Sequence, residues 1–67
     1  EHAESKLDFI HKMAIAQKEA NETDYWLDLL YESKYFDEKS YYPLKTDIQE
    51  IQKLLASIII SSKKNLK

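Results

Sequence analysis

The chain has 67 residues, enough for one structural unit but too few to bury a large core without disulfides, a metal or a partner. It contains no cysteine and no glycine, which excludes disulfides, cysteine-based zinc sites and glycine-rich phosphate loops. The formal charge of −2 is unevenly spread: residues 1–50 hold all 12 acidic side chains, and residues 51–67 hold four lysines and no acid.

The first predicted element is a long amphipathic helix at about residues 3–34. From Phe9 onward, apolar residues recur at alternate spacings of four and three, which is the heptad pattern of helices that pack side by side. This stripe consists of Phe9, Met13, Ala16, Ala20, Thr23, Leu27 and Leu30. A second stripe with Ile15, Trp26 and Leu29 makes the apolar face wider than a single neighbouring helix needs.

A short polar turn is predicted at about residues 35–40, before a second helix at about residues 41–64. Asp37 and Ser40 are both candidate N-caps, because either side chain can accept hydrogen bonds from the first amides of a helix. Pro43 favours Ser40, since proline is tolerated in the first turn and would kink the helix if it lay deeper.

The second helix has its own heptad stripe and is apolar nearly all round at residues 54–60. The stripe consists of Tyr41, Leu44, Ile48, Ile51, Leu55, Ile58 and Ser62. The short connection predicts an all-α fold in which the two helices form an antiparallel hairpin. An isolated hairpin would expose large apolar side chains, each worth about 1.5–3 kcal/mol when buried, at Ile15, Trp26, Leu54, Ile59 and Ile60. We therefore expect further helices to complete it.

One spacing is typical of a metal site. Asp8 and His11 have the carboxylate–x–x–histidine spacing of di-iron bundles, and Glu4 lies one turn earlier. Such a site needs a second copy of the motif, whereas the second helix offers only Asp47 and Glu50 and no histidine. A solvated polar face is therefore favoured, and no metal ligand is predicted.

Glu19 and Glu22 form a pair of carboxylates close to Trp26. Paired carboxylates beside an aromatic ring can perform acid–base chemistry when burial separates their pKa values. No nucleophile beside a base, phosphate loop or nearby histidine supports a reaction, so no catalytic residue and no cofactor are predicted. We expect the pair to bind cations or polar groups of a neighbouring helix.

Two features bear on nucleic acid. Aromatic residues gather near the turn, at Tyr31, Tyr35, Phe36, Tyr41 and Tyr42, and aromatic surfaces can stack bases or anchor protein interfaces. The C-terminal tail carries Lys63, Lys64 and Lys67, which could touch a phosphate backbone weakly. The chain has no arginine, so an interface or hairpin-end core is favoured for the aromatics, and neutralisation of the helix dipole is favoured for the lysines.

No stretch resembles a signal peptide or reaches the roughly 20 apolar residues of a membrane helix. We therefore expect a cytoplasmic protein without membrane contact.

The segment at residues 12–30 reads KMAIAQKEANETDYWLDLL. It resembles the small bacterial four-helix-bundle proteins encoded in intervening sequences of 23S ribosomal RNA genes, whose pattern is roughly K-L-x-I-A-x-K-E-A-x-E-T-x-Y-W-L-x-L-L. Residues 54–65 are similar to the C-terminal part of that family. The resemblance covers nearly the whole chain.

The resemblance implies that the hairpin is the C-terminal part of an up-and-down four-helix bundle, which assembles as a homo-oligomeric ring of about five copies, a pentamer. It implies that the family's first helix and half of its second precede Glu1, so these helices and further copies of the chain are the expected partners. It implies no enzymatic activity. A related accessory protein of diversity-generating retroelements has a similar bundle, is strongly basic and works with RNA.

The sequence thus predicts a non-enzymatic, self-associating bundle protein of unknown biological role. The alternative is an RNA- or nucleoprotein-binding accessory that acts as an oligomeric ring, which the acidic balance and the absence of arginine disfavour. The residues predicted for bundle or oligomer packing are Ile15, Glu19, Glu22, Trp26, Leu29, Leu54, Ile59 and Ile60.

Overall fold

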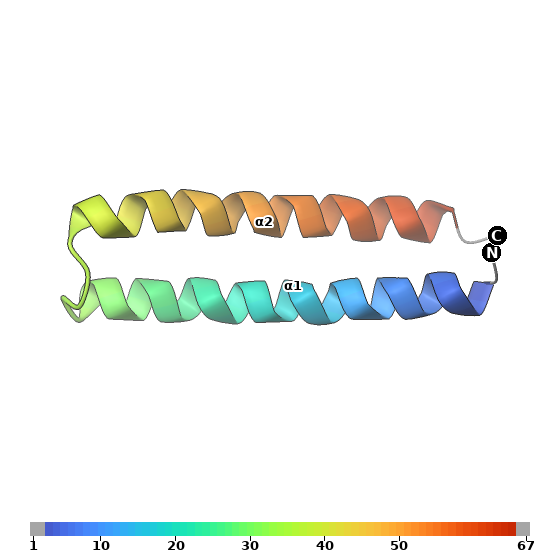
Figure 1. Ribbon diagram of the computed structural model, residues 1–67, viewed down its shortest axis with the longest axis horizontal. Coiled ribbons are helices and arrows are strands. Elements are labelled where there is room, and N and C mark those ends of the chain that lie inside the picture. Colours follow the sequence, from blue (N-terminus) through green and yellow to red (C-terminus); the bar gives the residue numbers. More distant parts are fainter. Residues whose placement is uncertain (1–2, 66–67) are drawn as a thin grey trace.

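A computed structural model describes residues 3–65, with side chains from Ser5 onward, as two long α-helices joined by a short turn (Figure 1). Helix α1 spans Ala3–Glu32 and helix α2 spans Glu38–Lys64. The helices lie side by side and run in opposite directions, in a rod of 48 × 14 × 13 Å. Residues 3–65 contain no strand. The predicted all-α antiparallel hairpin is therefore confirmed.

Helix α1 ends where the backbone of Lys34 adopts a left-handed conformation, with φ 67°. The Lys34 N–H donates to the Tyr31 carbonyl at 3.0 Å, and the Tyr35 N–H donates to the Leu30 carbonyl at 2.8 Å. These two bonds form a Schellman motif, which usually has glycine at the left-handed position. Because the chain has no glycine, lysine takes that position at a cost of about 1–2 kcal/mol.

Helix α2 begins earlier than the sequence predicted, and Asp37 caps it. The Asp37 carboxylate accepts a hydrogen bond from the Ser40 N–H at 2.9 Å, and the Tyr41 N–H donates to the Asp37 carbonyl at 2.9 Å. The prediction of Ser40 as the cap was wrong. Pro43 lies inside the helix and lacks one hydrogen bond to the preceding turn. The capping bond and the acidic Glu38 in the first turn favour the longer helix.

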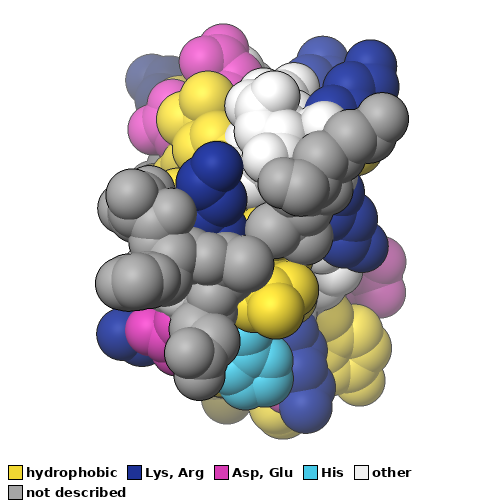
Figure 2. All heavy atoms as spheres, turned by 90° about the vertical axis from the view of Figure 1, so that its right-hand side faces the viewer, with side chains coloured by type: hydrophobic (Ala, Val, Ile, Leu, Met, Phe, Trp, Pro, Cys, Tyr) yellow, Lys and Arg dark blue, Asp and Glu magenta, His cyan; other side chains and the backbone are white. Residues whose placement is uncertain are grey.

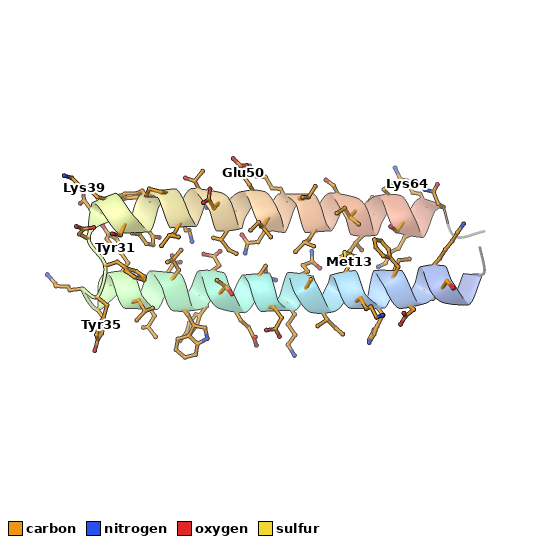
Figure 3. The ribbon with its side chains drawn as sticks, viewed as in Figure 1. Met13, Tyr31, Tyr35, Lys39, Glu50 and Lys64 are labelled. Carbon is orange, nitrogen blue, oxygen red and sulfur yellow. The ribbon has the colours of Figure 1, made fainter. Side chains whose placement is uncertain are left out.

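The two helices meet along a heptad seam that is rotated from the predicted one. Its positions are Lys6, Ile10, Met13, Gln17, Ala20, Asp24, Leu27 and Tyr31 on α1, and Tyr41, Lys45, Ile48, Gln52, Leu55, Ile59 and Ser62 on α2. Among the labelled side chains of Figure 3, Met13 and Tyr31 point between the helices and Glu50 points away from α1. At every second position of each predicted stripe, the next residue in the sequence faces the other helix instead of the predicted one. That next residue is often polar.

The core of the seam lies toward the turn. It is formed by buried Ala20, Leu27, Tyr41 and Ile48, with Tyr31, Phe36 and Leu55 packed against it. The Tyr31 and Tyr41 rings are stacked, with centroids 4.0 Å apart. No side chain from Ser5 to Asn65 is less than 2% exposed. The hairpin therefore has a thin seam of contacts and no deep interior.

Candidate functional site

A polar cluster lies in the half of the seam nearer the turn and holds the two helices in register. Lys45 of α2 forms ion pairs with Asp24 and Asp28 of α1, and its ammonium lies 3.0 Å from the Asp28 carboxylate. The Tyr41 hydroxyl donates to Asp28 Oδ1 at 2.6 Å, and Gln52 donates to Asp24 Oδ2 at 3.1 Å. Because these polar groups pair with one another, they can lie between the helices at little cost.

The same contacts fix the charges of the cluster at neutral pH. The hydroxyl of Tyr41, followed by the ammonium of Lys45, holds the pKa of Asp28 below its usual range. The hydrogen bond to Asp28 raises the pKa of Tyr41, and the carboxylates of Asp24 and Asp28 raise the pKa of Lys45. Asp28 is thus ionised, Tyr41 is neutral and Lys45 is charged, which is the state that the pairing stabilises.

Rotation of the seam leaves an apolar surface on one side of the hairpin. Phe9 and Leu30 of α1 and Leu44 and Ile51 of α2 each precede a seam residue by one position, and each exposes between 36% and 47% of its surface. Equivalent flanking positions of two antiparallel right-handed helices lie on the same side of the pair. These four residues therefore share one surface, here called the apolar face.

Two more exposed side chains border the apolar face. Trp26 of α1 is 56% exposed and Leu54 of α2 is 60% exposed. A shallow hollow open to solvent adjoins Leu54 and is lined by Asp47, Glu50, Ile51, Lys53, Leu54 and Ser57. A second hollow lies beside Phe9 and is lined by Ser5, Lys6, Phe9, Ser62 and Asn65. The face is thus continuous with grooves that suit side chains of a packed helix better than an enclosed small molecule.

The residues predicted for packing against other helices are exposed, apart from one. Ile15, Trp26, Leu29, Leu54 and Ile60 are exposed apolar side chains, and Glu19 and Glu22 are exposed as well. Ile59 is 8% exposed, so the prediction of an exposed side chain there was wrong. It lies four positions after Leu55 in the seam between α1 and α2.

The remaining charged candidates are not gathered into a site. Asp8 pairs with Lys12 at 3.1 Å, and His11 is exposed on α1; the side chain of Glu4 lies outside the described residues. Within the described part of the chain, no three His, Asp or Glu side chains are close enough to hold a metal ion. The Thr23 hydroxyl donates to the Glu19 backbone carbonyl at 2.9 Å.

The aromatic residues near the turn divide into an inner and an outer group. Tyr41 stacks on Tyr31, and Tyr42 packs edge-on against Tyr41 with ring centroids 5.1 Å apart. Phe36 packs against the core, whereas Tyr35 is 77% exposed and points away from the helices (Figure 3). Most of these rings therefore form the core at the end of the hairpin, as the sequence favoured.

The C-terminal lysines lie at the end of the hairpin opposite the turn. Lys63 and Lys64 are exposed in the last turn of α2, where their charge offsets the helix dipole; Lys67 lies outside the described residues. Figure 2 looks along the hairpin from this end and shows lysine side chains among acidic and hydrophobic ones. Neither helix described here is long and apolar enough to cross a membrane.

The fold and its exposed surface define an all-α protein built on a helical hairpin with one unpartnered apolar face. A family model described as 23S rRNA-intervening sequence protein matches residues 1–57. The chain belongs to this family. No curated protein and no solved structure matches it closely.

The sequence analysis predicted neither the apolar face nor the polar cluster, and both omissions have one cause. It assigned Phe9, Leu30, Leu44 and Ile51 to the seam because they are apolar. The sequence also contains a second heptad series, which takes the next residue at every second position of the predicted one. That series places Lys45 opposite two carboxylates. That complementarity of charge across the turn was the available signal.

Proposed function

We propose that this chain is a non-enzymatic structural subunit that completes a four-helix bundle by association, and that the bundle functions as a homo-oligomer. The observation that carries the proposal is the apolar face. Phe9, Leu30, Leu44 and Ile51 lie on one side of the pair, and nothing in the described hairpin covers them. A face of this kind on two antiparallel helices is the surface that a second pair buries in a four-helix bundle.

The energetic argument follows from the exposed fractions. Full burial of a large apolar side chain contributes about 1.5–3 kcal/mol. Because the residues of the face are a little under half exposed, covering each of them would contribute about 1 kcal/mol. The four residues of the face, together with Trp26 and Leu54, would then add several kcal/mol. Whole domains are stable by only about 5–15 kcal/mol. Association would therefore supply a large part of the stability of the folded chain.

The charged residues support a structural role. Asp24, Asp28 and Lys45 are brought close together, but they pair with one another in the seam. Glu19 and Glu22 lie in the outer stripe of α1, beside Ile15 and Trp26, where a neighbouring helix or subunit would cover them. As partners we propose further helices of the kind that the family resemblance implies and other copies of the chain, in a ring of about five copies.

The test compares aspartate substitutions on the apolar face with one away from it. The double variant Leu44→Asp, Ile51→Asp places charge on the apolar face, whereas Gln49→Asp places it on an exposed position on the opposite side of α2. Sedimentation velocity should show that the parent and Gln49→Asp exceed the 8.0 kDa of a single chain and that the double variant does not. Equal masses for all three proteins would contradict the proposal.

A second candidate function, RNA or nucleoprotein binding, is favoured by the exposed Lys63 and Lys64, which a ring would repeat around its rim. Phosphate contacts strengthen as salt falls, because bound cations are released from the nucleic acid. Titration of generic RNA at decreasing salt tests this function. The absence of binding at low salt would eliminate it and leave the structural proposal standing.

A further inference from the structure

The apolar face is rimmed by acidic side chains. Glu19 and Glu22 lie on the exposed side of α1 near Trp26, and Asp47 and Glu50 line the hollow of α2. Among the described side chains, these four carboxylates make no ion pair and accept no hydrogen bond.

The cations close to this rim do not balance it. Lys12 pairs with Asp8 at 3.1 Å, farther along α1. Lys53 lines the α2 hollow, where two carboxylates accompany it. The rim is therefore net negative around its apolar centre.

The position of the acids along the rod restricts what can cover the face. All four lie in the middle part of their helices, and the hydrogen bond of 3.0 Å from Gln52 to Asn21 places the two acidic pairs at a similar height. In a two-fold pairing of this face with its own copy, the middle of one face meets the middle of the other. Glu22 and Glu50 would then lie close to carboxylates of the copy, which is unfavourable.

We infer that the apolar face binds an amphipathic helix carrying lysine or arginine beside its apolar stripe, in preference to a second copy of the same face. This inference rests on the proposed function, in which the face is an interface, and it names the chemistry of the occupant. The partner's apolar side chains would cover Phe9, Leu30, Leu44 and Ile51. Its cations would reach the carboxylates at the rim of the face.

The two modes of association differ in their response to salt. Self-pairing through an acidic face strengthens when salt screens the repulsion, whereas binding of a basic helix weakens. Screening is appreciable at ordinary concentrations, because the Debye length is about 10 Å at 0.1 M salt and about 30 Å at 0.01 M.

The test uses two synthetic helical peptides with identical apolar residues, one flanked by lysines and the other by glutamates. Binding to the full 67-residue chain is measured by calorimetry at low and high salt. The lysine peptide should bind about tenfold more tightly than the glutamate peptide at low salt, as several exposed ion pairs would give. High salt should reduce the difference.

A matched set of variants tests the acidic rim itself. The combination Glu19→Gln, Glu22→Gln, Asp47→Asn and Glu50→Gln should bring the two peptide affinities to within about twofold. Glu32→Gln, which neutralises an exposed acid away from the face, should leave the tenfold preference unchanged. A preference that survives the fourfold variant would overturn the inference.

The outcomes also separate this inference from the proposed function. Equal binding of both peptides, or tighter binding of the glutamate peptide, would overturn the inference. If neither peptide bound while the chain associated with itself, the inference would fail and the self-association would stand. A folded monomer that bound only the lysine peptide would support the inference and refute the homo-oligomer of the proposed function, since the face would still be an interface.

Discussion

Removal of the Lys45 ammonium should destabilise the hairpin more than removal of any exposed lysine. Lys45 contacts both Asp24 and Asp28, and its side chain is only 20% exposed. Exposed ion pairs contribute about 0.2–1 kcal/mol, and hydrogen bonds to charged groups in less exposed surroundings contribute about 1.5–3 kcal/mol. The substitution Lys45→Met keeps most of the side-chain stem and should lower the free energy of unfolding by about 2 kcal/mol.

The substitution leaves two carboxylates side by side without their cation, which is why the loss should exceed that of an ordinary surface pair. The assay is urea unfolding followed by circular dichroism, with all proteins at the same concentration because association also contributes to stability. Lys53→Ala, on an exposed position of the same helix, is the control and should change stability by no more than about 0.5 kcal/mol. A Lys45→Met protein as stable as its parent would refute the role assigned to the cluster.

Two further substitutions and two changes of pH test the same structure. Lys34→Gly should raise stability by about 1 kcal/mol in urea unfolding, because glycine takes the left-handed backbone without strain; an unchanged midpoint would contradict the Schellman geometry. Trp26 is 56% exposed in the hairpin, so Trp26→Ala should act through assembly. Sedimentation should show a weaker oligomer, while helicity at the same concentration falls only as far as dissociation explains. Raising the pH above about 10 should progressively lower the free energy of unfolding, because Tyr41 and Lys45 have raised pKa values. The stability that they contribute is fully present below their unfolded pKa values and is lost as the pH rises through the raised values. Lowering the pH should remove the contribution of Asp28, whose pKa is depressed, as the pH falls below the ordinary value of 3.8; a flat pH profile at both extremes would contradict the cluster.

The existence and orientation of the two helices were predictable because local signals agree. Long heptad patterns without glycine indicated the helices, and a polar segment of a few residues forced them to run antiparallel. The start of α2 was less certain, because the capping preference of Asp37 and the position of Pro43 conflict. In the structure Asp37 is the cap, and Pro43 lies inside the helix without a hydrogen bond to the preceding turn.

The face that each helix turns toward its partner was not predictable from hydrophobicity alone. Both heptad series share Met13, Ala20 and Leu27, so the apolar pattern fits two rotations of α1. Cross-helix pairing of polar groups selects one of them: Lys45 and Gln52 enter the seam because their partners lie opposite. Such pairing depends on the register between the helices, which the sequence of either helix alone does not contain.

The most direct test is a dilution series on the chain, with molecular mass and thermal unfolding measured at each concentration. If neighbouring helices must cover the exposed apolar side chains, the melting temperature and the mass should fall together on dilution, as mass action requires when assembly stabilises the fold. A constant, sharp transition in a protein that keeps the 8.0 kDa mass of one chain throughout would contradict the account.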